Sequence, residues 1–419
     1  MKLVKTTFFS AIITFIRIAS GFTASKVVAI FTGPSGVALI GAFANFITIV
    51  LTFANGAINT GVIKYTAEFD GDEAKLKRLF STSFKISIYC SLIVGLILLI
   101  LAPYCSAWIF ASDLYSNAIH VLGLTIILYS LNSLLISILN GKKEIKVYTI
   151  VNTAGSLIGL LFTVILVYFY KINGALYALV LAQSIVFFVT LILIIKRPWF
   201  SWNYFNGKFD RVIGKQLGSY SLMAVVTALT APVSQIVLRN MVISKVGINE
   251  AGYWQGMMRV SDGYLLIITT SLATYYLPKL SSLKTNLELR KEILSVYKIV
   301  LPVVLLGCML IFFLRFFIIK LLYTDGFLAM ENLFLWQLAG DFFKIASWIL
   351  AYLMLAKAMT KMYIICEIGF SVLYVVLGYV LVDHFHLKGI TIAFALNYFI
   401  FLMIMIFTFR RILFKTTSS

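Results

Sequence analysis

Long apolar segments recur along almost all of the 419 residues. About 20 mostly apolar residues form a helix that crosses the hydrocarbon core of a bilayer, where only helices and closed barrels satisfy their own backbone groups. The sequence therefore predicts an all-α polytopic membrane protein with twelve transmembrane helices. They are expected at residues 8–31, 37–60, 82–104, 114–139, 148–170, 174–196, 216–243, 249–277, 295–318, 327–356, 362–382 and 389–410.

The composition excludes a soluble enzyme. Hydrophobic residues make up 61% of the chain and charged residues 12%, whereas soluble domains carry about 25% charged residues. The sequence contains no nucleophile–base pair, no metal-ligand cluster and no glycine-rich phosphate loop. Its four cysteines are scattered without a C-x-x-C spacing, which favours small core residues. We therefore expect no catalytic activity, no cofactor and no metal.

The positive charges are distributed unequally between alternate connections. Twenty-four Lys and Arg residues fall in the termini and in the connections on one side of the predicted membrane, and four fall on the other side. By the positive-inside rule, the side that carries the 24 basic residues and both termini is cytoplasmic. This distribution explains the net charge of +19 without a nucleic-acid partner.

One sequence offset relates the two halves of the chain. Five pairs of identical residues lie 215 positions apart, which favours a duplication of six helices. We predict two six-helix lobes, residues 1–210 and 211–419, around a central cavity near the middle of the membrane. The pairs are Lys64 and Lys279, Lys142 and Lys357, Lys146 and Lys361, Tyr148 and Tyr363, and Gly174 and Gly389.

Arg17 lies deep in the first predicted span. A charge at the centre of a membrane helix costs about 2.5–3.5 kcal/mol on the insertion scale, so it usually faces a cavity or a partner. The N-terminal half has no acid within its spans. Arg17 is therefore expected either to meet an anionic ligand, because a guanidinium matches phosphate oxygens, or to pair with an acid of the other half.

Two spans of the C-terminal half each carry charges at helical spacing. If these faces meet, Arg259 pairs with Asp341 and Lys344 with Asp262. The alternative is local ion pairs at i, i+3 that only neutralise each other. The first reading gives a network that a proton or a cation can break. The two faces comprise Gln255, Arg259 and Asp262 in one span and Gln337, Asp341, Lys344 and Trp348 in the other.

Two further polar features lie within spans. Glu367 has Asn152 at the matching position of the first half, an asymmetry that fits ion coupling and equally fits a carboxyl hydrogen-bonded in a core. The second span carries a polar stripe on one face, which either lines a hydrated cavity or joins helices. The stripe consists of Asn45, Thr48, Thr52, Asn55 and Asn59.

Six short motifs in this order resemble the Wzx-type lipid-linked oligosaccharide flippases, in the O-antigen and lipid III branch of the multidrug/oligosaccharidyl-lipid/polysaccharide exporter superfamily. The resemblance covers the whole chain. The motifs are Gly33-Pro-Ser-Gly36, Gly61-Val-Ile-Lys64-Tyr65-Thr-Ala67, Trp254-Gln255-Gly256, Arg259-Val-Ser-Asp262-Gly-Tyr264, Tyr276-Leu-Pro278 and Trp336-Gln337-Leu-Ala-Gly340-Asp341.

This resemblance implies a function in the bacterial inner membrane. An undecaprenyl-diphosphate-linked glycan would pass from the cytoplasmic to the periplasmic leaflet by alternating access, coupled to a proton or sodium ion. It implies membrane lipid, an O-antigen polymerase and a chain-length regulator as partners. The diphosphate or acidic sugars would meet Arg17, Lys26, Lys64 and Arg259. The cavity would also include Asn55, Asn59 and Gln255, and the coupling network would consist of Asp262, Asp341, Lys344 and Glu367.

Other membrane proteins fit the sequence less well. A drug/cation antiporter of the same superfamily is the main alternative, but it binds cations, and a basic cavity disfavours these. A lipid II flippase usually has more than twelve spans. An O-antigen polymerase or ligase presents a large periplasmic loop with catalytic arginines or histidines, and no such loop is predicted here.

Overall fold

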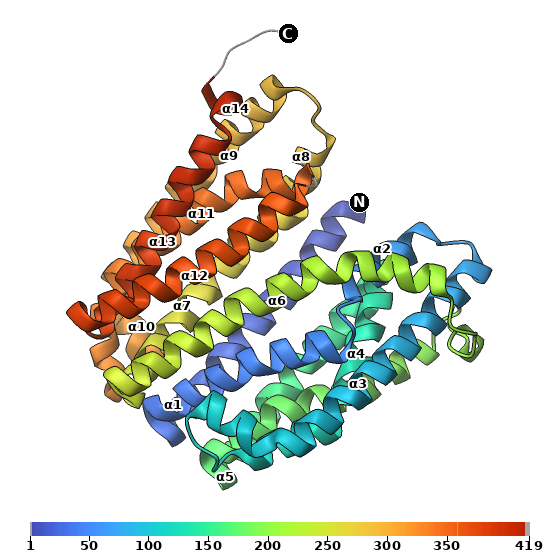
Figure 1. Cartoon of the computed structure of the whole chain (residues 1–419), viewed down its shortest axis with the longest axis horizontal. Helices are drawn as coiled ribbons and strands as arrows, with labels where there is room; N and C mark the ends of the chain where they lie inside the picture. The colour runs from blue at the N-terminus through green and yellow to red at the C-terminus, as the bar shows by residue number, and fades with distance from the viewer. Residues whose placement is uncertain (1, 358, 415–419) are drawn as a thin grey trace. The chain divides into compact units, whose positions relative to one another are not determined.

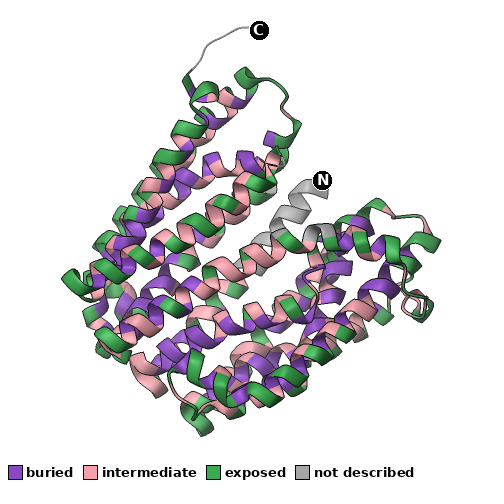
Figure 2. Cartoon of the chain, viewed as in Figure 1, coloured by how far each residue is buried: buried purple, intermediate pink, exposed green. Residues whose placement is uncertain are grey.

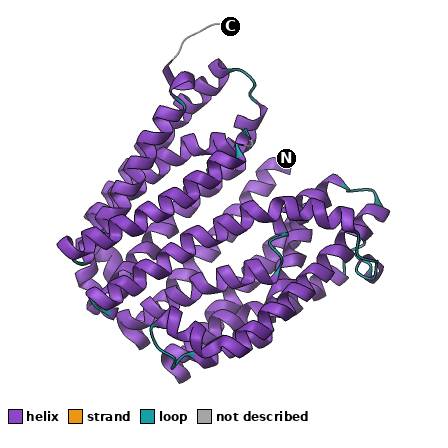
Figure 3. Cartoon of the chain, in the orientation of Figure 1, coloured by secondary structure: helices purple, strands orange, loops and turns teal. Residues whose placement is uncertain are grey.

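The computed structural model describes the backbone of residues 2–357 and 359–414, and their side chains except for residues 2–14, Ser219, Tyr220, Met223 and Thr274. Lys2, Lys5 and Lys415 of the charge count therefore lie outside the described side chains. In the described part, every regular element is a helix (Figure 3).

The helices follow one another with short connections (Figure 1). Three are not α-helices: η1 and η3 are 3₁₀-helices and η2 is a π-helix. Their bounds are α1 Lys2–Ala54, α2 Asn59–Glu68, α3 Glu73–Phe110, α4 Ser116–Gly141, α5 Ile145–Ile195, η1 Trp202–Tyr204, α6 Arg211–Lys245, α7 Ile248–Ser271, η2 Leu272–Tyr276, α8 Leu277–Ser282, α9 Asn286–Phe313, α10 Arg315–Leu322, η3 Asp325–Leu333, α11 Phe334–Ala356, α12 Thr360–Phe385, α13 Leu387–Thr408 and α14 Arg410–Phe414.

Nine helices within the described residues are long and apolar enough to cross a membrane. Two of these contain a residue with non-helical dihedral angles, Gly33 in α1 (φ 65°, ψ −167°) and Lys171 in α5 (φ 52°, ψ −125°). Each is therefore two helices in series. The predicted spans 8–31, 148–170 and 174–196 fall on these parts. The predicted span 37–60 is too long at its end, because α1 ends at Ala54 and α2 begins at Asn59. Helix α7 corresponds to the predicted span 249–277 and is too polar to be among the nine.

By contacts between residues, the described chain divides into two compact units. Unit 1 contains the residues up to Thr32 and Leu39–Ile236, and unit 2 contains Gly33–Ala38 and the chain from Val237 onward. The first part of α6 belongs to unit 1 because Ile213 and Leu217 pack in a buried cluster with Val62, Leu79 and Leu134. The lobes 1–210 and 211–419 remain a prediction.

The backbone repeats the sequence offset of 215. Lys171 and His386 both have positive φ, with φ and ψ of 52° and −125° in one and 50° and −137° in the other. Three residues later, a Cβ atom on Gly174 would lie 1.9 Å from the carbonyl oxygen of Leu166, and one on Gly389 would lie 2.1 Å from that of Leu381. Only glycine fits such a close approach.

A second pair of turns repeats in the same way. The backbone N–H of Glu144 donates to the carbonyl of Leu139 at 3.0 Å, and that of Met359 donates to Met354 at 2.7 Å. Glu144 and Met359, which precede α5 and α12, also share nearly the same dihedral angles. Two turns of the backbone therefore repeat at the offset of 215, with one copy of each in either unit.

Helix packing within unit 1 relies on small and weakly polar residues. Helix α3 buries Ser83, Ser87, Ser91 and Gly95, and five large apolar side chains between residues 92 and 100 are exposed. Figure 2 colours the buried and exposed residues of each helix. A Cβ atom on Gly95 would lie 2.8 Å from the carbonyl oxygen of Gly123 in α4. Close approach at small residues drives helix association in lipid, where apolar side chains gain nothing from leaving their surroundings. The outward side chains are Leu92, Ile93, Leu96, Ile97 and Ile100.

The two duplicated glycines provide a test of this packing. We expect Gly174→Ala and Gly389→Ala each to destabilise the protein by about 2 kcal/mol, because the added methyl group overlaps a backbone that must shift. Gly159→Ala and Gly369→Ala are matched controls in α5 and α12, since an added Cβ there meets no atom within 4 Å. Thermal unfolding in detergent measures the difference. Equal melting temperatures for all four variants would contradict the close approach.

Candidate functional site

The most buried carboxyl group of unit 2 belongs to Asp341 in α11, which has 0% of its surface exposed. Three neutral donors contact it: Ser261 Oγ donates at 2.6 Å, the Tyr264 hydroxyl at 2.5 Å and Gln337 Nε2 at 3.3 Å. The Tyr264 hydroxyl also lies 3.9 Å from Cys308 Sγ of α9. A buried carboxyl held by neutral donors can accept a proton or a cation by rearranging these few hydrogen bonds.

These partners differ from the ones that the residue spacing suggested. Among the ion pairs of the described residues there is none between Arg259 and Asp341, nor between Lys344 and Asp262, and neither local i, i+3 pair is present. The reason is the orientation of α7. Arg259 is half-buried and Asp262 is exposed, whereas the adjacent face of the helix is buried. That buried face includes Trp254, Met257, Met258, Ser261 and Leu265.

Lys344 lies one turn after Asp341 on α11, and three aromatic rings surround it. Its Nζ atom is 5.1 Å from the ring centre of Trp348, 5.9 Å from that of Phe394 and 5.7 Å from that of Tyr398. Cation–π attraction stabilises an ammonium in such a cage. The rings therefore hold the Lys344 side chain on the same helix as Asp341.

Arg239 of α6 is the most buried basic side chain of unit 2, with 1% of its surface exposed. Its Nη2 donates to Gln255 Oε1, and its guanidinium lies 5.7 Å from the ring centre of Trp254. Within the described structure, Arg239 Nε and Nη1 and Trp254 Nε1 have no hydrogen-bond partner. Buried donors without acceptors are costly, and the oxygens of an anion are the groups that satisfy several donors at once.

The four cations expected to meet substrate lie in different surroundings. Arg17 is exposed on α1. Lys26 is half-buried. Lys64 is exposed and lies 3.9 Å from Glu68. In unit 2, Arg259 is half-buried, and Glu367, the remaining predicted coupling residue, is half-buried in α12. The roles of these residues remain predictions.

The asparagines of the polar stripe use their amides within unit 1. Asn45 Nδ2 donates to Gln235 at 2.9 Å, and Asn59 Nδ2 donates to Ser133 at 2.7 Å. Asn55, which is buried, accepts the N–H of Ala57 at 2.9 Å, where the backbone turns through positive φ. These contacts fit the reading in which the stripe joins helices, and any contact of Asn55 or Asn59 with substrate remains a prediction.

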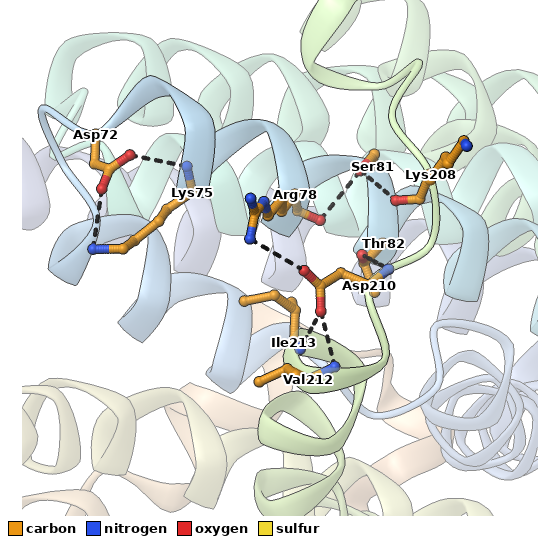
Figure 4. Close-up of polar contacts among 9 residues, drawn as sticks. All are labelled: Asp72, Lys75, Arg78, Ser81, Thr82, Lys208, Asp210, Val212 and Ile213. Carbon is orange, nitrogen blue, oxygen red and sulfur yellow. Dashed lines mark hydrogen bonds and ion pairs between the residues drawn. The ribbon is translucent and has the colours of Figure 1, made fainter.

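A pocket of about 520 Å³ lies at the start of α6, away from these spans. The chain from 207 to 211 and the first turns of α3 surround it (Figure 4). Nearby, the pKa of Asp72 is lowered because its carboxylate accepts the backbone N–H and the ammonium of Lys75. The pocket is lined by Ala74, Lys77, Arg78, Ser81, Gly207, Lys208, Phe209, Asp210 and Arg211.

Comparison with known proteins assigns the chain to a family. Residues 9–332 match the model of the polysaccharide biosynthesis protein family. The chain is 30% identical over 401 residues to the lipid III flippases of Escherichia coli (strain K12) and Shigella flexneri, covering 96% of this chain and of each relative. The protein therefore belongs to this family of the exporter superfamily, and the resemblance to Wzx-type flippases is confirmed. It is a multi-pass protein of the bacterial inner membrane.

Solved structures establish the fold. An inward-facing multidrug resistance MATE family transporter of the MOP superfamily superposes with a TM-score of 0.78 at 18% identity, covering 97% of this chain and 96% of that one. The inward closed lipid II flippase MurJ superposes with a TM-score of 0.72 at 17% identity, covering 97% and 87%. At these identities the likeness shows the fold alone.

Sequence reasoning did not assign roles to Ser261, Tyr264, Cys308 or Arg239. Ser261 and Tyr264 lie next to Asp262 in the sequence, and this position could have identified them as candidates. They were missed because the search for helical spacing considered only charged and amide side chains, and hydroxyl groups carry no charge. Arg239 lies four residues before the end of its predicted span, and only the fold reveals that Gln255 and Trp254 contact it.

The hydrogen bonds to Asp341 predict energetic coupling. Tyr264→Phe should lower the free energy of unfolding by about 1–3 kcal/mol, because the buried carboxylate loses a donor. In the Asp341→Asn background the same substitution should cost at least about 0.5 kcal/mol less. Thermal unfolding of the four proteins of this cycle, with Tyr275→Phe at an exposed position as a control, measures the coupling. Strict additivity would contradict the contact.

Proposed function

We propose that the protein is a flippase for undecaprenyl-diphosphate-linked oligosaccharides, moving an O-antigen repeat unit or a related glycan from the cytoplasmic to the periplasmic leaflet. The observation that carries the proposal is the relationship to two lipid III flippases along 96% of the chain. Intramembrane cations support it, because a diphosphate cannot enter about 30 Å of hydrocarbon without compensating charge. Such a protein transports its substrate and catalyses no chemical step.

The proposed architecture has twelve transmembrane helices in two six-helix lobes, 1–210 and 211–419, around a central cavity, with both termini in the cytoplasm. The kinks at Gly33 and Lys171 support this number, since they divide two long helices into four spans. The duplicated turns around Lys171 and His386 support two equivalent lobes. Alternating access then consists of one lobe moving against the other around a fixed binding site.

In this proposal, Arg17, Lys26, Lys64 and Arg259 bind the diphosphate or acidic sugars. A guanidinium binds two phosphate oxygens at once and keeps its charge when water is excluded. Arg239 adds a buried cation whose Nε and Nη1 lack acceptors within the described structure. Asn55, Asn59 and Gln255 add amides to this binding set, and the glycan leaves it when the opposite face opens.

Asp341 is the proposed coupling residue. Its hydrogen bonds with Ser261, Tyr264 and Gln337 support this role, because binding of a proton or sodium ion would change each of them. Breaking this network would alter how α7 and α11 pack within unit 2. Asp262, Lys344 and Glu367 would set the local charge, so that uptake of one ion is favoured at one stage of the cycle.

A drug/cation antiporter remains the alternative function, and the likeness to a MATE transporter concerns the fold alone. The basic residues favour an anionic substrate over a cationic drug. The polymerase and chain-length regulator of the same process are proposed as partners because both handle the same lipid-linked unit.

Complementation tests the proposal as a whole. The protein is expressed in a bacterial strain that lacks its flippase, and surface polysaccharide is measured together with lipid-linked units in the inner leaflet. We expect polysaccharide to return and the intermediate to fall. Stable membrane expression without either change, for several sugar units, would overturn the flippase proposal in favour of the antiporter.

Arg17→Ala should abolish translocation and leave membrane insertion intact, because the diphosphate loses a bidentate partner. Arg17→Lys keeps the positive charge but lacks the paired N–H donors of the guanidinium, so it should retain part of the activity. Lys298→Ala, at an exposed position near the start of α9's apolar part, serves as the matched control. Surface polysaccharide from a well-expressed Arg17→Ala protein at the unmodified level would refute this role.

Asp341→Asn should reduce the rate of translocation at least tenfold, because the amide keeps the size of the carboxyl but cannot take up a proton. Binding of the lipid-linked glycan to the purified variant should be unchanged. Gln337→Glu is a useful comparison, since it places a second titratable group one turn away. Full translocation by Asp341→Asn under an imposed ion gradient would exclude Asp341 as the coupling residue.

A further inference from the structure

The pocket at the start of α6 is strongly basic and plays no part in the proposed transport path. Four of its nine lining residues are Lys or Arg, namely Lys77, Arg78, Lys208 and Arg211, against one acid, Asp210. At about 520 Å³, it has the size of a small-ligand site. Clustered basic side chains in such a pocket are suited to a phosphate group.

The backbone of the pocket is fixed to α3 by buried hydroxyl groups. Ser81 Oγ lies 3.4 Å from the carbonyl oxygen of Lys208 and 3.2 Å from that of Arg78, and its one hydroxyl proton is shared between them. Thr82 Oγ1 accepts the N–H of Asp210 at 3.0 Å (Figure 4). Gly207 approaches so closely that a Cβ atom there would lie 2.7 Å from Ser81 Oγ. Segment 207–210 is therefore held on the helix, and the pocket is formed without a ligand.

The one acid that lines the pocket, Asp210, already has partners within the protein. One carboxylate oxygen of Asp210 accepts the N–H groups of Val212 and Ile213 at 2.8 and 3.2 Å and so caps α6, while the other lies 3.9 Å from Arg78 (Figure 4). Lys77, Lys208 and Arg211 are exposed, and none of them belongs to an ion pair of the described residues. Three cations thus remain for an anion.

The chain just before the pocket indicates where that anion comes from. Residues 199–209 contain six aromatic side chains. Phe205 packs on Phe80 and Phe84 of α3, whereas Trp202 and Phe209 are 60% and 48% exposed. Exposed aromatic side chains beside basic ones are typical of the layer where lipid headgroups meet water. Basic pockets at this level bind anionic headgroups.

We propose that this pocket binds the phosphate headgroup of an anionic phospholipid, with Lys77, Lys208 and Arg211 as its ligands and Trp202 and Phe209 beside its acyl chains. Arg211 is the first residue of α6, the helix that continues from unit 1 into unit 2 at residues 236 and 237. A lipid held there fastens one end of the connecting helix. Its effect on the rate of transport rests on the proposed flippase function, whereas its binding does not.

Lipid binding by the purified full-length protein tests this site. Delipidated protein in detergent is titrated with phosphatidylglycerol, phosphatidylcholine or inorganic phosphate, and bound lipid is counted by native mass spectrometry. We expect one saturable phosphatidylglycerol, with no comparable binding of phosphatidylcholine. The triple variant Lys77→Gln, Lys208→Gln, Arg211→Gln should weaken this binding at least tenfold. High salt should also weaken it, because the three ligands are exposed.

Two further variants distinguish binding in the pocket from nonspecific attraction of the lipid to any positive charge. Lys284→Gln, Lys291→Gln and Lys298→Gln together remove three exposed charges from the connection to α9 and from α9 itself, and should leave binding unchanged. Ala74→Trp should block the pocket without changing any charge. Equal loss in both triple variants, or unchanged binding in the pocket variants, would overturn the site. Displacement of the lipid by inorganic phosphate or by an undecaprenyl diphosphate at equal concentration would also overturn the assignment to a phospholipid.

The binding result is independent of the flippase assay. A pocket variant that loses the lipid and still complements a flippase-deleted strain shows a lipid site without control of transport. A protein that binds the lipid but fails to complement with any sugar unit leaves the pocket standing and removes the proposed function.

Discussion

The inability of hydrocarbon to solvate peptide groups and charges determines most of this structure. Long helices satisfy their own backbone, and where the chain turns, it does so with hydrogen-bonded carbonyls or at closely packed glycines such as Gly174 and Gly389. The same constraint makes the middle of α3 bury Ser87, Ser91 and Gly95 while Leu92 and Leu96 are exposed. A water-soluble helix would show the reverse arrangement.

This constraint also separates the intramembrane charges into distinct environments. Asp341 is held by neutral donors, Lys344 by aromatic rings, and Arg239 by one amide oxygen. Among the ion pairs of the described residues, none includes Asp341 or Lys344. Each of the two side chains can therefore serve a separate role. A carboxyl that exchanges an ion and cations that hold a diphosphate can then serve separate steps of one transport cycle.

The sequence predicted the elements that depend on local patterns. Apolar segments located the helices, and the offset of 215 located turns whose backbone angles match, as at Lys171 and His386. It was wrong about which face of α7 meets Asp341, because helical spacing places Arg259 and Asp262 on one face without showing how that helix is rotated. Ser261 and Tyr264 contact the carboxyl instead. The basic pocket was also missed, since the bond from Ser81 to Lys208 joins residues 127 positions apart.

Transport of a defined substrate by purified protein tests the central claim most directly. The protein is reconstituted in liposomes with a polyprenyl-diphosphate-linked sugar, and an enzyme added outside reports the fraction of sugar in the outer leaflet over time. We predict that the protein accelerates transfer of this lipid and gives little transfer of an uncharged polyprenyl glycoside. Transfer of a cationic drug with none of the diphosphate-linked sugar would contradict it.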